Sequence, residues 1–145
     1  MVKWNEYVEE KEKERIDSNG MVPEGVYDVT VANVVRRSKY NNPDSVYTMV
    51  TFDPIDEGQV PPIFVYSGYN SGDTKKDNFV HYKAVGLTNE IYAAADVDPS
   101  EWDLDEDDPM FDGLSRIIGA SLKVIVELNQ KTGRMDTIPL VPPER

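Results

Sequence analysis

The sequence predicts a mainly β domain, β plus α, with five strands and one main helix between the third and fourth strands. Two observations lead to this fold class. Short segments in which apolar and polar residues alternate, as in strands with one buried face, recur along the chain. One longer segment, from Asp77 to about Ala95, instead places its apolar residues at helical spacing. This order of elements is that of a five-stranded Greek-key barrel of the OB type, and an open α+β sheet has the same order.

The first two strands are expected within residues 25–54. Apolar and polar residues alternate from Tyr27 onward, and residues 45–53 are rich in the β-branched and aromatic types that favour strands. This second strand has apolar residues on both faces, which is typical of a central strand. Between the two, the basic residues at 36–39 precede Asn41-Asn42-Pro43-Asp44, which favours a turn. We therefore expect a basic loop at one end of these strands.

The rest of the chain supplies the other elements. Phe64 and Tyr66 share one face of the third strand, and Pro139 indicates that the fifth strand lies at a sheet edge. A glycine in the segment 129–133 is suited to a hairpin loop. The expected elements are a third strand at 63–69, a short helix at 111–118, a fourth strand at 120–128 and a fifth strand at 134–141.

Composition limits the class of protein. The chain has no cysteine, which excludes disulfides and thiolate metal sites. No apolar run reaches the roughly 20 residues that span a bilayer. We therefore expect no membrane partner. The expected location is the cytoplasm, or the cytoplasm of the host cell if a phage encodes the protein. Residues 1–20 are expected to form a charged N-terminal helix or extension, and residues 21–145 the folded domain.

The charge is unevenly distributed. The formal net charge is −12, and the segment 96–112, with nine carboxylates and no Lys or Arg, alone carries −9, which leaves −3 for all other residues together. We expect a solvated acidic insertion there. The spacing of Asp103, Asp105 and Asp107 resembles the start of a calcium loop, but the glycine and glutamate required at its sixth and twelfth positions are absent. No metal site and no cofactor are therefore predicted.

Several segments carry a resemblance to a known family. They are VPEGVYDVTV (22–31), RRSKYNN (36–42), YTMVTFD (47–53), KAVGLTNEIYAAADV (83–97), FDGLSRIIGASLKVIVEL (111–128) and KTGR (131–134). In these segments the chain resembles small phage and prophage proteins with OB-type folds, which are found among replication and recombination functions. The resemblance implies single-stranded DNA as the partner. The last residues, IPLVPPER, differ from the acidic partner-recruiting tail of other single-strand binders.

A binder of single strands needs cations to meet phosphates and flat side chains on which bases stack. In an OB-type barrel the first loop and the last hairpin loop lie at the same groove. The alternative is that the aromatic residues are core and the cations only solubilise the loops. The residues assigned to phosphate are Arg36, Arg37, Lys39, Lys131 and Arg134, and those assigned to bases are Tyr40, Tyr47 and Tyr66.

The sequence therefore predicts non-catalytic binding of single-stranded DNA in phage replication or recombination. No enzyme activity is expected, because the one histidine, His81, has no recognisable catalytic partners. The acidic segment could contact replication or recombination proteins, and a homo-oligomer is compatible with the sequence. The alternative function is an acidic protein-binding module, or a DNA mimic that inhibits a host nuclease or defence protein.

Overall fold

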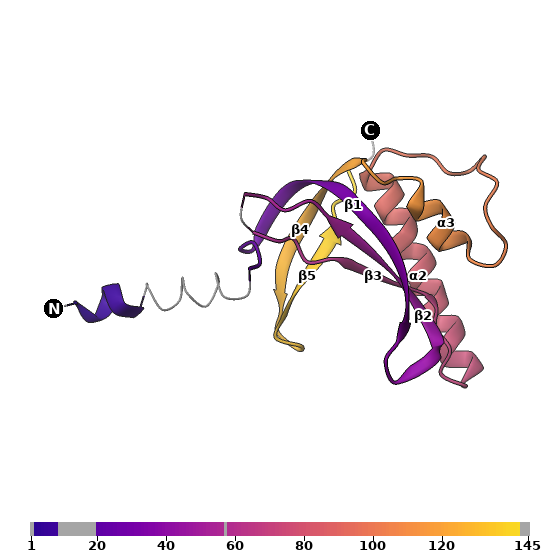
Figure 1. The fold of residues 1–145 in the computed structure, drawn as a ribbon, viewed down its shortest axis with the longest axis horizontal. Coiled ribbons are helices and arrows are strands. Elements are labelled where there is room, and N and C mark those ends of the chain that lie inside the picture. The colour runs from indigo at the N-terminus through magenta and orange to yellow at the C-terminus, as the bar shows by residue number, and fades with distance from the viewer. Residues whose placement is uncertain (1, 9–19, 57, 143–145) are drawn as a thin grey trace.

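The computed structural model describes residues 2–8, 20–56 and 58–142. Residues 4–8 are helical, as expected for the N-terminal segment. The remainder of that predicted helix, up to Asp17, lies outside the described residues. From residue 20 onward the described chain forms a sheet with helices against it (Figure 1).

The structure is mainly β, as the sequence predicts. Neighbouring strands are antiparallel, and together they form one five-stranded sheet in the order β3-β2-β1-β4-β5. The second strand is therefore central, also as predicted. The strands are β1 (Gly25–Lys39), β2 (Asn42–Phe52), β3 (Ile63–Gly68), β4 (Ser121–Asn129) and β5 (Arg134–Pro139).

The long strand β1 belongs to both halves of the sheet. Its residues 25–30 pair with β4, and its residues 31–39 pair with β2. The register shifts between Val31 and Asn33, which leaves Ala32 as an extra residue without a partner on β2. Such a β-bulge bends a strand and increases its twist. Accordingly, β1 curves across the sheet in Figure 1.

The closed Greek-key barrel is not confirmed, because the sheet is open with β3 and β5 at its edges. The two edges approach each other at one point, where the buried Thr137 hydroxyl donates a hydrogen bond to the Pro61 carbonyl. Pro61 and Pro62 lead into β3, and Pro139 ends β5. Proline has no N–H to donate to a ladder, so these residues work against pairing of the two edges.

The predicted basic loop is wrong, because the basic residues belong to β1 itself. The connection is a turn at Tyr40-Asn41, and β2 has already started at Asn42. The register shifts between Ser38, paired with Val46, and Lys39, paired with Asn42, which forms a bulge in β2. Proline is tolerated at a bulge because no ladder hydrogen bond is required there. The turn-favouring residues 43–44 therefore lie within β2 instead of ending it.

The core lies between the sheet and two helices. Along β4, the buried Leu122, Val124 and Val126 alternate with less buried residues. Ile91 of the first of these helices and Leu114 of the second are fully buried in the same core. Figure 1 shows both helices on the same side of the sheet. The helices are α2 (Thr74–Ala94) and α3 (Pro109–Ser115).

Helix α2 begins earlier than predicted. Its N-cap is Asp73, not Asp77, and the Asp73 carboxylate accepts hydrogen bonds from the backbone N–H groups of Lys75 and Lys76. Both aspartates are suitable caps by residue type. The choice is made by tertiary contacts, because Asp77 is engaged by Ser71 in the preceding loop.

The acidic segment (residues 96–112) is anchored to the helices. The Trp102 ring lies edge-on to the Tyr92 ring, with 5.8 Å between centroids, and the Arg116 guanidinium lies 5.7 Å from the Trp102 centroid. The segment is thus more than a solvated insertion, although most of its carboxylates are exposed. Trp102, through its contacts with Tyr92 and Arg116, attaches the acidic segment to α2 and α3.

Packing of α3 on α2 requires a glycine. A β-carbon at the buried Gly113 would overlap the Tyr92 hydroxyl oxygen, while the ring Cζ atom would lie at 3.4 Å. We expect Gly113→Ala to lower the free energy of unfolding by about 1–3 kcal/mol, the usual cost of overpacking. The double variant Gly113→Ala/Tyr92→Phe should recover part of that loss. Urea unfolding of both variants and of Tyr92→Phe alone measures this, and additive losses would contradict the proposed clash.

Candidate nucleic-acid interface

A groove of about 410 Å³ opens between the β3 and β5 edges of the sheet. The residues before and within β3 form one side, and β5 with the turn before it forms the other. The groove therefore occupies the gap that a β3–β5 ladder would fill in a closed barrel. Its lining residues are Lys39, Tyr47, Pro61, Pro62, Phe64, Tyr66, Thr132, Arg134, Met135 and Asp136.

Four aromatic residues, here called the aromatic wall, lie on the β2–β3 side. They are Tyr47, Phe64, Tyr66 and Tyr69. The ring centroids of Tyr47 lie 5.9 Å from Phe64 and 6.4 Å from Tyr66, and Tyr66 lies 6.2 Å from Tyr69. Phe64 and Tyr66 are 46% and 42% exposed. The alternation of β3 explains this exposure, because Ile63 and Val65 fill the core positions on its other face.

Cations flank the aromatic wall. The Lys39 ammonium lies 5.4 Å from the Tyr69 ring centroid and 5.9 Å from that of Tyr66, and Lys76 lies 5.9 Å from Tyr69. Such cation–π contacts hold the ammonium groups beside the rings. Arg134 lines the groove from β5. Positive charge therefore lies on both sides of an exposed aromatic surface.

A network of hydrogen bonds fixes the loop that carries Tyr69. The buried Ser45 hydroxyl of β2 donates to the Asn70 carbonyl at 2.8 Å and accepts from the Asn70 N–H at 2.7 Å. Farther along, the N–H and hydroxyl of Ser71 both donate to Asp77 of α2, and these bonds hold the pKa of that carboxyl below its ordinary value. The loop is thus tied to β2 and to α2.

The predicted residues divide by location. Lys39, Tyr47, Tyr66 and Arg134 line the same groove. Arg37 is exposed and directly opposite Tyr47 in the β1–β2 register, and directly opposed residues share a face of the sheet. Tyr40, at the β1–β2 turn, is fully exposed, and Lys131, in the β4–β5 turn, is also exposed; neither lines the groove.

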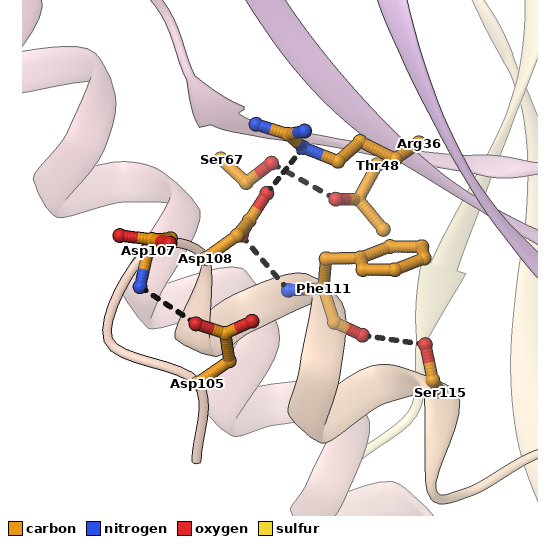
Figure 2. A network of polar contacts seen from close by, with 8 residues as sticks. All are labelled: Arg36, Thr48, Ser67, Asp105, Asp107, Asp108, Phe111 and Ser115. Carbon is orange, nitrogen blue, oxygen red and sulfur yellow. Dashed lines mark hydrogen bonds and ion pairs between the residues drawn. The ribbon is translucent and has the colours of Figure 1, made fainter.

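Arg36 lies on the other face of the sheet from Arg37. It is opposite the buried Thr48, and its Nε donates to the Asp108 carboxylate at 2.7 Å (Figure 2). Asp108 is also the N-cap of α3 and accepts from the Phe111 N–H. Arg36 therefore connects β1 to the acidic segment and does not line the groove.

Two residues of this surface were missed by sequence reasoning. Tyr69 is the last residue of the predicted third strand and was given no role, and Asp136 was given none either. The period-two pattern of Phe64 and Tyr66 could have drawn attention to an aromatic surface, but Tyr69 joins it through a loop that the Ser45–Asn70 and Ser71–Asp77 contacts hold in place. No sequence signal was available for Asp136.

Other site types have less support in the described part of the chain. There, no three His, Cys, Asp or Glu side chains form a group that could hold a metal ion. Among the same residues, no helix has the length and apolar character needed to cross a membrane. No protein-family model matches the chain, and no curated protein shows significant similarity to it. A functional assignment must therefore start from the groove.

The Arg36–Asp108 contact permits a stability test. Asp108→Ala removes both an N-cap and an ion pair, whereas Asp108→Asn keeps a good cap and removes the ion pair alone. We expect a loss of about 1–2 kcal/mol in unfolding free energy for the alanine variant and under about 1 kcal/mol for the asparagine variant, since Arg36 is half-exposed. Equal losses in urea unfolding would show that capping of α3 contributes little.

Proposed function

We propose that this protein binds single-stranded DNA without catalysis, and that the strand lies in the groove between β3 and β5. The observation that carries this proposal is the aromatic wall with cations on both sides of it. Stacking of a base on an aromatic side chain contributes roughly 1–3 kcal/mol, and it tolerates any sequence because every base has a flat face. Lys39, Lys76, Arg37 and Arg134 are available for phosphates.

The sheet order supports an OB-type fold for this function. In that fold the β2–β3 surface and the loops between β1 and β2 and between β4 and β5 bind oligonucleotides. The groove has the corresponding parts, since Tyr47 and Tyr66 come from β2 and β3 and Arg134 begins β5. A role in phage replication or recombination, with proteins of that machinery as partners, follows from the resemblance noted above.

Substitution of the neighbouring residues Arg36 and Arg37, one at a time, tests on which face of the sheet the strand binds. We expect Arg37→Ala to weaken binding of a labelled mixed-sequence single strand and to make the slope of log affinity against log salt less steep by about 0.7, one phosphate contact. The starting slope should be near −3 if about four phosphates are neutralised. Arg36→Ala is the matched control, because it removes the same charge from the other face of the sheet. Fluorescence anisotropy measures both, and equal effects would place the strand elsewhere.

The aromatic wall is tested by truncation. Tyr66→Ala should cost about 1–3 kcal/mol of binding free energy if a base stacks there. Tyr82→Ala is the control, since Tyr82 is 78% exposed on α2 and does not line the groove. Binding of duplex and single strand with the same affinity, or no binding at low salt, would reject the proposed function.

A second candidate has one observation in its favour. Within the acidic segment, Glu101, Asp103 and Glu106 are exposed and have no ion pair among the described residues. As an acidic module or DNA mimic, the protein would inhibit a nuclease acting on duplex DNA.

The triple variant Glu101→Gln/Asp103→Asn/Glu106→Gln should abolish such inhibition and leave single-strand binding intact. Absence of inhibition of the nucleases of the host cytoplasm by the unaltered protein would reject this candidate.

A further inference from the structure

One groove residue does not fit simple phosphate binding. Asp136 of β5 is exposed and lines the groove together with Arg134. A carboxylate in that position repels phosphates, so Asp136 opposes the term that dominates affinity for nucleic acid. Within the groove it can favour a bound molecule only if that molecule offers hydrogen-bond donors, because an ionised carboxylate accepts hydrogen bonds and cannot donate them.

The Asp136 carboxylate is held in place and partly available. The side-chain amide of Asn129 donates to its Oδ2 atom at 2.9 Å, across the β4–β5 hairpin. No described contact uses Oδ1. Arg134 lies two residues earlier, and residues at that spacing share a face of a strand, yet no ion pair joins it to Asp136 within the described chain. The groove therefore presents a separate donor, Arg134, and a separate acceptor, Asp136.

The donors of a single strand are on its bases. Cytosine and adenine each carry an exocyclic amino group beside a ring acceptor, and guanine also has an amino donor. Thymine presents carbonyl oxygens on either side of its one ring N–H. A carboxylate accepts well from the cytosine amino group and is repelled by the thymine carbonyls. An arginine nearby can donate to the acceptor next to the amino group.

We propose that Asp136 gives the groove a base preference, so that it binds bases with exocyclic amino groups more tightly than thymine. This inference rests on the proposed function, since a base must first stack on the aromatic wall to reach β5. The wall then supplies affinity that is independent of sequence, and the Arg134/Asp136 edge distinguishes among the stacked bases.

Two pyrimidine strands isolate this effect. Homopolymers of thymidine and of 5-methylcytidine, each about ten deoxynucleotides long, have the same ring methyl group and differ at the atoms that face a donor or acceptor. By fluorescence anisotropy at matched salt, we expect the unaltered protein to bind the 5-methylcytidine strand about fivefold to tenfold more tightly, the lower end of the range for one good contact to a base edge.

The variant Asp136→Asn should lose this preference, because an amide can present either its oxygen or its nitrogen to the base. Its affinity for the thymidine strand should rise as the negative charge is removed. Glu127→Gln is the matched control, since Glu127 is directly opposite Asp136 on β4 but does not line the groove. It should retain the preference of the unaltered protein. Circular dichroism establishes that both variants are folded.

The outcomes separate the two proposals. Equal affinity of the unaltered protein for the two strands overturns the base preference and leaves single-strand binding standing. A preference that persists in Asp136→Asn shows that another residue reads the base and also overturns the inference. Binding of neither strand at low salt rejects the proposed function, and the base preference with it.

Discussion

The bend of β1 at its bulge is the constraint on which the rest of the structure depends. Because β1 pairs with β4 through residues 25–30 and with β2 through residues 31–39, a single bent strand joins both halves of the sheet. The outer strands β3 and β5 are consequently brought toward each other, and Thr137 of β5 donates a hydrogen bond to Pro61, which precedes β3. The prolines there cannot extend a ladder. The remaining space between the edges is the groove.

The same strand separates opposite charges. Neighbouring residues of a strand point to opposite faces, so Arg36 faces the acidic segment and Arg37 faces the groove side. The protein can therefore be strongly acidic overall and still have a basic surface, since exposed charges farther apart than about 8 Å are largely screened at physiological salt. Trp102 and the Asp108 cap keep the acidic segment on the helix side of the sheet.

The rings of the aromatic wall are held in position by contacts with one another and with a neighbouring cation. Tyr47 contacts both Phe64 and Tyr66, and Lys39 lies over Tyr66 and Tyr69. Because the rings are carried by paired strands and by an anchored loop, little side-chain freedom remains to be lost when a ligand stacks on them. A preorganised surface of this kind binds more tightly than a flexible one of equal area.

The sequence by itself determined which elements form, their order along the chain and the place of the main helix between the third and fourth strands. These features follow from local periodicity, as in β4, where Leu122, Val124 and Val126 recur at every second residue and are buried. Local turn chemistry was less informative. Pro43 was placed in a loop, but pairing of Arg37 with Tyr47 extended both strands and left the proline in a bulge.

Only the tertiary structure decided which polar residues come together. The separation of Arg36 from Arg37, the entry of Tyr69 into the aromatic wall and the place of Asp136 opposite that wall all depend on contacts between residues distant in sequence. Only the tertiary structure also decided that β3 and β5 remain unpaired edges. Periodicity predicts that the strands exist, but not whether the two edge strands of the sheet pair with each other. Such contacts depend on the curvature of the whole sheet, which local sequence patterns do not predict.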